Sequence, residues 1–172
     1  PAAELIPFFE QAAEAVDYLH KNNVSHRDIK PQNILHQKGY AKLADFGLAR
    51  MHEHTQTTVG SEMGTPLFMA PEVWRKKVSL HSDQYSLAGT YYMARTGKQL
   101  FEATSTYDLA HKHMNDVPLL LGVDGEEKRV LQKALSKKPD ERYPNCRAFA
   151  AALRAAIFPP PPPTAPAPRN RL

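Results

Sequence analysis

Four polar side chains that could do chemistry lie close together in the chain: His26, Asp28, Lys30 and Asn33. Apolar residues flank them on both sides, and a loop anchored in the core at both ends can hold a polar tip rigidly. Such a loop suits phosphoryl transfer, in which catalysis depends on positioning and on charge stabilisation. Asp28 could take a proton from a substrate hydroxyl, Lys30 could stabilise phosphoryl oxygens, and Asn33 could offer its amide oxygen to a magnesium ion.

A second carboxylate that could bind the same cation is Asp45. The intervening chain must bring it back beside Asn33. Two short segments, residues 34–36 and 40–44, flank Gln37-Lys38-Gly39. This pattern predicts a β-hairpin with Gly39 in its turn. The hairpin would place Asp45 next to Asn33.

These segments resemble the eukaryotic-type, or Hanks-type, protein kinases. Residues 26–33, His-Arg-Asp-Ile-Lys-Pro-Gln-Asn, are similar to the catalytic loop of that family, and Asp45-Phe46-Gly47 is similar to its metal-binding turn. Lys30 followed by Pro31 resembles the serine/threonine branch, and the last helices and proline-rich end resemble bacterial members. The resemblance implies an α+β, mainly α fold, the C-terminal lobe of a kinase with a small β-hairpin at the catalytic cleft.

The resemblance also implies cofactors and roles for individual residues. The cofactors would be ATP and Mg²⁺ or Mn²⁺. Asp28, Lys30 and Thr65 would be catalytic. Lys30, Asn33 and Asp45 would contact ATP and its phosphates, and Asn33 and Asp45 would also bind the metal ion.

Further residues would have structural or regulatory roles. Glu72, in Ala70-Pro71-Glu72, would form a buried ion pair with Arg142. Asp83 would accept hydrogen bonds from the backbone of the catalytic loop, although an acid in a first helical turn also suits the helix dipole without any such role. The complete set is His26, Arg27, Phe46, Gly47, Glu72, Asp83 and Arg142.

Residues 48–72 lack a steady period and are rich in Thr, Ser, Gly and His, which predicts an irregular surface segment. In the family this is the activation segment. A phosphate there would add nearly two negative charges, and Arg27 would be the cation that pairs with it. Thr65 would hydrogen-bond Asp28 and Lys30 and favour serine or threonine substrates. The candidate phosphorylation sites are Thr55, Thr57, Thr58 and Ser61, and a Thr-rich segment that is merely polar is the alternative at each.

Most of the remaining chain has helical periodicity. Apolar residues at three- and four-residue spacings predict helices at residues 3–21, 83–95, 106–113 and 126–135, and a last one that Asn145 caps and that ends near residue 157. Gly97 is expected to end the second of these helices. Residues 118–125 and 138–143 are expected to form a loop and a turn.

The chain has 172 residues, of which 42% are hydrophobic and 23% charged, which fits one globular domain. We expect a kinase domain at residues 1–158 and a Pro-rich disordered linker at 159–172, with a proline-motif docking site as the alternative for the latter. Nothing upstream of the catalytic loop resembles a glycine-rich phosphate loop or a strand lysine. We therefore expect a fragment that lacks the smaller N-terminal lobe.

Several other classes of protein are disfavoured. A single cysteine, Cys146, excludes an internal disulfide and is expected to pack in a helix. No apolar run is long enough for a membrane span. The net charge of +4 is scattered, so nucleic acid is not an expected partner. The His-x-His pairs at 52/54 and 111/113 lack companion ligands, and polar surface is a better interpretation than zinc.

The intact protein is therefore predicted to transfer the γ-phosphoryl group of ATP to serine or threonine hydroxyls of protein substrates. This chain alone is expected to have little or no activity. A second copy is the expected partner for autophosphorylation in trans. The expected location is cytoplasmic, with the full-length protein anchored at the inner face of the membrane. The alternatives are a pseudokinase that acts as a binding module and a small-molecule phosphotransferase.

Overall fold

The computed structural model describes residues 1–47, 49–51 and 64–159. This part of the chain is mainly helical, with two small antiparallel sheets of two strands each. The predicted mainly α fold with a small hairpin is therefore confirmed. The helices are α1 (Ala2–Lys21), α2 (Pro71–Trp74), α3 (Leu80–Thr96), α4 (Thr106–Asn115), α5 (Gly125–Ala134) and α6 (Cys146–Ile157). Short 3₁₀ turns occupy Pro31–Asn33, Pro66–Phe68 and Pro139–Glu141.

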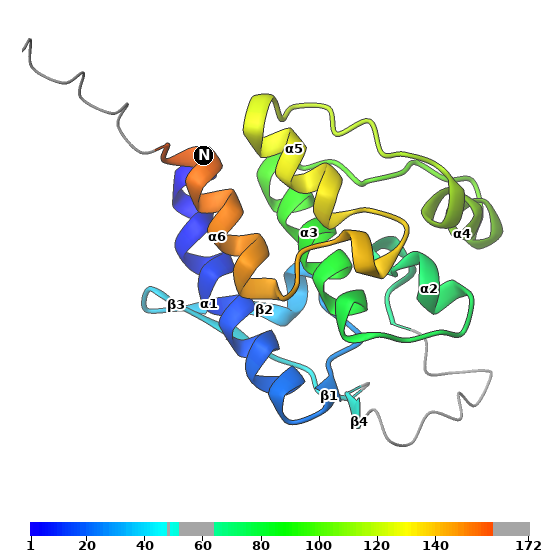
Figure 1. The fold of residues 1–172 in the computed structure, drawn as a ribbon, viewed down its shortest axis with the longest axis horizontal. Helices are drawn as coiled ribbons and strands as arrows, with labels where there is room; N and C mark the ends of the chain where they lie inside the picture. Colours follow the sequence, from blue (N-terminus) through cyan, green and yellow to red (C-terminus); the bar gives the residue numbers. More distant parts are fainter. Residues whose placement is uncertain (48, 52–63, 160–172) are drawn as a thin grey trace, which may run out of the picture.

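Helix α3 is the centre of the fold, and α1, α5 and α6 pack around it (Figure 1). All of residues 82–92 are buried, which is expected of a helix that is covered on every side. Helices α1 and α6 lie side by side, and α4 stands at the opposite end of the molecule (Figure 1). The core between α1 and α3 includes an edge-to-face contact of Phe9 with Tyr91, whose ring centroids are 5.1 Å apart. The α1 helix thus fixes where the catalytic loop begins.

The predicted hairpin is present and consists of β2 (Ile34–Gln37) and β3 (Tyr40–Leu43). Ile34 pairs with Leu43 and Gln37 with Tyr40. The connection is a tight turn of Lys38 and Gly39, whose φ angles are 51° and 84°. Two residues of positive φ match the right-handed twist of the strands that they join. The hairpin therefore returns the chain to the point from which it left.

A second pairing, which the sequence analysis did not predict, joins β1 (Val24–Ser25) to β4 (Arg50–Met51). It lies between the end of α1 and the segment that follows Gly47. Each strand has only two residues, too few for an alternating pattern to be visible in the sequence. The pairing holds the segment that follows Gly47 against the residues that precede His26.

Some predicted helix boundaries are wrong. Helix α3 begins at Leu80 and not at Asp83, because Ser79 and Ser82 form a capping box, with the Ser79 N–H donating to Ser82 Oγ at 3.0 Å. The segment predicted to be irregular up to Glu72 contains the first two residues of α2. The predicted end of α3 is confirmed, since Gly97 has a φ of 72° and its N–H donates to the Met93 carbonyl.

The last helix agrees with the prediction. Asn145 caps α6 by accepting a hydrogen bond from the Ala148 N–H at 2.8 Å. Within the described residues, no helix combines the length and the apolar character needed to cross a bilayer.

Candidate active site

Asp28 is the centre of a hydrogen-bond network at the catalytic loop. Its Oδ2 accepts from Lys30 Nζ at 2.6 Å and from Asn33 Nδ2 at 3.1 Å. Its Oδ1 accepts from the Thr65 backbone N–H and from Thr65 Oγ1, both at 2.8 Å. Lys30 also donates to Thr65 Oγ1 at 3.0 Å. Four of the residues singled out from the sequence are therefore in direct contact, and one of them comes from a distant segment.

The network keeps a buried carboxylate ionised. Asp28 is only 7% exposed. Burial alone would raise the pKa of Asp28, but hydrogen bonds from Lys30 and Thr65 outweigh burial and hold this pKa below its ordinary value. The side chain is thus a proton acceptor at neutral pH.

The backbone of the loop is fixed from beneath by Asp83. Its carboxylate oxygens accept hydrogen bonds from the N–H groups of His26 and Arg27, each at 2.9 Å. Arg27 has a φ of 68°, which is uncommon for a residue other than glycine and persists only where the surroundings enforce it. These hydrogen bonds are the ones that the resemblance implied for Asp83. Its position in the first turn of α3 also suits the helix dipole, so the two interpretations are compatible.

His20, at the end of α1, contacts the same carboxylate. Its Nε2 lies 2.8 Å from Asp83 Oδ2. The sequence analysis did not identify this residue. A histidine in the last turn of a helix is ordinarily explained by the helix dipole, so no local signal marks its contact with Asp83.

His26 connects the loop to the segment after the hairpin. Its ring is buried, with Nε2 3.1 Å from the Ala44 carbonyl oxygen and Nδ1 3.4 Å from the Asp28 nitrogen. These contacts fit a neutral imidazole that donates from Nε2 and accepts at Nδ1. The Phe46 ring lies 5.2 Å from the His26 ring, and Phe46 is otherwise half exposed.

The hairpin brings the backbone that precedes Asp45 back to Asn33. The Ala44 N–H donates to the Asn33 carbonyl at 2.8 Å, so Asp45 follows directly after this contact. Asp45 is exposed, has a φ of 60°, and its Oδ1 accepts a hydrogen bond from the Gly47 N–H at 3.2 Å. Its carboxylate is not part of the hydrogen-bond network around Asp28 in the described residues.

The donor set of Asn33 and Asp45 fits a hard divalent cation. The Asn33 amide nitrogen donates to the backbone oxygen of Asp28 at 2.8 Å as well as to its carboxylate. The amide oxygen, on the other side of the planar group, therefore faces away from Asp28. One amide oxygen and one exposed carboxylate are ligands that Mg²⁺ prefers, with water completing its shell.

Gly64 allows Thr65 to approach the loop. A Cβ atom at Gly64 would lie 2.2 Å from the Arg27 carbonyl oxygen, so no larger residue fits without moving the backbone. The sequence analysis did not single out Gly64. Its close approach explains why the residue before Thr65 is a glycine.

The end of this segment is held by a buried ion pair. Glu72 and Arg142 form two parallel contacts of 2.8 Å, and Ser82 Oγ donates to Glu72 Oε1 at 2.8 Å. Burial would raise the pKa of Glu72, but the Arg142 guanidinium and the hydrogen bonds hold it below its ordinary value. The pairing implied by the resemblance is present in the structure.

Some predicted features lie outside the described residues. They are the phosphorylation sites Thr55, Thr57, Thr58 and Ser61, the pair His52 and His54, and the proline-rich sequence after Pro159. The phosphate-binding role of Arg27 depends on these sites. For the other His-x-His pair the predicted polar surface is right for His111, which is exposed, and wrong for His113. His113 is fully buried against Tyr85, whose hydroxyl is 2.9 Å from its Nδ1.

Comparison with known proteins gives one consistent result. The model of the family described as "Protein kinase domain" matches residues 1–153. The chain is 35% identical over 151 residues to the serine/threonine-protein kinase ULK3 of Xenopus laevis, which covers 83% of this chain and 32% of that protein. It is 34% identical over 163 residues to the serine/threonine-protein kinase PknB of Mycolicibacterium smegmatis, covering 89% of this chain and 25% of that protein. It is 33% identical over 165 residues to the serine/threonine-protein kinase PknF of Mycobacterium tuberculosis, and this match covers 89% of this chain and 35% of that protein. The chain thus spans about a quarter to a third of the length of these relatives.

Proposed function

The chain belongs to the protein kinase domain family, and on that premise we propose that the protein containing it transfers the γ-phosphoryl group of ATP to serine or threonine hydroxyls of protein substrates. The observation that carries this proposal is the buried Asp28 carboxylate, which Lys30 and Thr65 keep ionised. Members of the family use ATP with a divalent cation, and Mg²⁺ is the ion that we propose here.

Asp28 would position the substrate hydroxyl and accept its proton. Among the described residues, four hydrogen bonds reach its carboxylate, two at each oxygen. A substrate hydroxyl must therefore replace one of these donors. The Lys30 ammonium is the donor best able to leave, because it is on a flexible side chain and a phosphoryl oxygen offers it a stronger negative partner.

Lys30 would thus have two partners in turn. In the described structure it bridges Asp28 and Thr65. With a nucleotide bound, it would turn to the transferred phosphoryl group and stabilise the developing charge there. This movement would free Asp28 Oδ2 for the substrate, so that the base becomes available only when the nucleotide is in place.

Asn33 and Asp45 would hold the divalent cation. When bound, the cation would neutralise charge on the phosphates of ATP. The protein's own contribution is the hairpin. Its register lets the Ala44 N–H donate a hydrogen bond to the Asn33 carbonyl, and this contact brings Asp45 to the loop.

Thr65 would align the substrate segment. It contacts Asp28 through both its backbone N–H and its hydroxyl, so the chain around it lies beside the base. A short serine or threonine side chain fits a base that is buried and close to this backbone. The printed names of the relatives, all serine/threonine kinases, support the same preference.

The decisive experiment is Asp28→Asn in the full-length protein, assayed with ATP and a generic protein substrate. Asparagine keeps the shape but accepts no proton, so turnover should fall by about 10²–10⁴-fold, the usual contribution of a general base. Nucleotide affinity, measured separately by fluorescence titration, should be nearly unchanged. Asp140→Asn, at an exposed carboxylate, is the matched control.

Two outcomes would contradict the proposal. Wild-type turnover in Asp28→Asn would show that Asp28 is not the base. A wild-type protein that binds nucleotide but never transfers phosphate would instead favour the binding module.

We further propose residues 1–158 as the kinase domain portion of this chain, since α6 ends at Ile157 and proline follows Phe158. We also propose a cytoplasmic location for this domain, the anchoring of the full-length protein at the inner face of the membrane, and autophosphorylation between two copies of the protein.

A further inference from the structure

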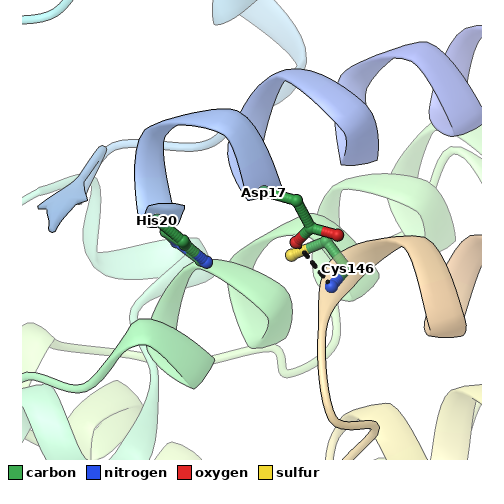
Figure 2. A group of neighbouring side chains, drawn as sticks. All are labelled: Asp17, His20 and Cys146. Carbon is green, nitrogen blue, oxygen red and sulfur yellow. Dashed lines mark hydrogen bonds between the residues drawn. The ribbon is translucent and has the colours of Figure 1, made fainter. Parts of the chain in front are cut away.

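Three metal-ligating side chains of different kinds meet beneath the catalytic loop, at a place that phosphoryl transfer does not use. Asp17 and His20 come from the end of α1, and Cys146 is the first residue of α6 (Figure 2). One potential ligand atom from each residue lies within 4.8 Å of the other two. Asp17 and Cys146 are 7% and 1% exposed, so the cluster is inside the molecule and not a chance grouping of surface charges.

We propose that Asp17, His20 and Cys146 form a binding site for a thiophilic divalent cation, of which Zn²⁺ is the best match. Zinc takes imidazole nitrogen, thiolate sulfur and carboxylate oxygen together, at bond lengths of about 2.0–2.3 Å. Tetrahedral ligands at such bond lengths lie roughly 3.3–3.7 Å apart. Small rotations of these side chains are therefore enough to close around one ion.

Two of the proposed ligands, His20 and Asp17, are already oriented by neighbouring groups, as ligands in metal sites generally are. His20 Nε2 is hydrogen-bonded to Asp83 Oδ2 at 2.8 Å, which fixes the orientation of the ring. The two Asp17 oxygens accept hydrogen bonds from the N–H groups of Cys146 and Arg147 at 2.9 and 3.0 Å. A carboxylate oxygen has a second lone pair with which to bind the ion.

Charged groups of both signs surround the cluster, because Lys21 lines the same cavity and Asp83 contacts His20. Asp17 and Asp83 both lie near the thiol of Cys146, and burial together with these carboxylates raises the pKa of that thiol. Without a cation the thiol stays protonated. Cation binding would replace that proton with a divalent charge, so affinity should increase with pH.

There is room for the remaining ligand. A cavity of about 300 Å³ adjoins the cluster and is lined by the three residues together with His81 and Gln84, among others. Water can enter such a space and fill the fourth position. His81 offers a second candidate, because burial and the Arg142 charge lower the pKa of its imidazole and keep it neutral.

The proposed site is distinct from the one formed by Asn33 and Asp45, yet the two are connected. Asp83 contacts His20 on one side and holds the backbone of His26 and Arg27 on the other. A cation bound by His20 would perturb Asp83, the residue that holds the backbone of the catalytic loop. The site is thus placed to couple a thiophilic cation to the geometry of the loop.

The test uses the full-length protein, stripped of metals with a chelator and titrated with Zn²⁺ in competition with a chromogenic chelator. We expect one ion per chain, lost on protonation as pH falls. Substituting Co²⁺ should give the near-ultraviolet absorption of a cobalt–thiolate bond. Absence of that absorption in the cobalt-loaded wild-type protein would overturn the proposal. This measurement does not depend on the folding of any variant.

Variants then assign the ligands. Cys146→Ser should abolish the thiolate absorption, and both Cys146→Ser and His20→Gln should weaken zinc binding at least about tenfold. His111→Gln, at an exposed histidine on α4, is the matched control and should bind as the wild type does. Undiminished zinc affinity and an unchanged cobalt spectrum in Cys146→Ser would show that any bound ion is held elsewhere.

Discussion

The buried pair of Glu72 and Arg142 allows a prediction whose size follows from the structure. Arg142→Met keeps much of the volume of the side chain but removes its charge and its donors. Glu72 is only 6% exposed, so the carboxylate would be left without its cation in a place that water barely reaches. Removing one partner of such a pair costs about 3–5 kcal/mol of unfolding free energy.

Two further contacts of Arg142 place the expected loss within that range. Arg142 also donates to the backbone oxygens of Ser136 and His81, at 2.9 and 2.8 Å. Each orphaned acceptor adds about 1 kcal/mol to the loss. The Ser82 hydroxyl, 2.8 Å from Glu72 Oε1, would remain and offset part of it. We therefore expect a loss at the upper end of that range, about 5 kcal/mol, near neutral pH.

The sign of the pH dependence provides an independent check. In the wild type, the lowered pKa of Glu72 stabilises the folded state above the unfolded carboxyl pKa, and this stability is lost as pH falls. In Arg142→Met, the guanidinium no longer outweighs the effect of burial on the pKa of Glu72. The pKa of Glu72 in the folded state should therefore rise above its value in the unfolded state. The contribution of this residue should then be most favourable at low pH and be lost as pH rises.

The assay is urea unfolding of the full-length protein at several pH values. Trp74, two residues from Glu72 in α2, provides a fluorescence signal close to the pair. Arg154→Met is the matched control, since its pair with Glu10 is 56% and 35% exposed and should contribute less than about 1 kcal/mol. The double variant Glu72→Gln/Arg142→Met should recover part of the loss. Additive losses, or a cost of Arg142→Met no larger than that of the control, would refute the reasoning.

Three shorter predictions follow from other contacts. Thr65→Val removes a hydroxyl that donates to Asp28 at 2.8 Å, so the pKa of Asp28 should rise. The acid limb of the pH–rate profile should therefore move to higher pH. Thr65→Ser keeps the hydroxyl and should leave the acid limb in place. Asn145→Ala removes the cap that accepts from Ala148 N–H and should cost about 1 kcal/mol in urea unfolding, and an unchanged midpoint would contradict the capping role. Thermal stability should fall as pH is lowered from about 5 towards 3, because the folded pKa values of Asp28 and Glu72 lie below their unfolded values; a melting temperature that is constant over this range would speak against both contacts.

The sequence predicted best those features that depend on local pattern or on short motifs. The spacing of apolar residues in α1 and the Lys38-Gly39 turn each contain enough local information to specify their element. The grouping of Asp28, Lys30 and Asn33 is equally local, since these residues lie in one loop. Thr65 came only from the family resemblance, because no local rule brings a residue so far along the chain back to Asp28.

The features that the sequence did not reveal depend on tertiary contacts. The start of α3 was placed too late because Asp83 is a plausible first-turn acid, whereas the Ser79–Ser82 capping box lies a turn earlier. The pairing of β1 with β4 involves two residues from each strand, so it has no periodic signal. The contact of Asp17 with the start of α6 joins residues 129 and 130 positions apart and satisfies two backbone N–H groups that sequence reasoning would assign to Asn145 alone.

The contacts of Asp83 and Asp17 explain why the site needs a mainly helical frame. A loop of polar residues cannot hold Arg27 at a positive φ by its own propensities, and the restraint comes from the Asp83 carboxylate on the buried helix α3. Asp83 is in turn contacted by His20 on α1, and Asp17, one turn earlier, holds the start of α6. Three helices therefore converge below the loop, and each joins the next through a charged or polar side chain. A disturbance at the end of α1 should accordingly reach Asp28 through Asp83 and the loop backbone that Asp83 holds at His26 and Arg27.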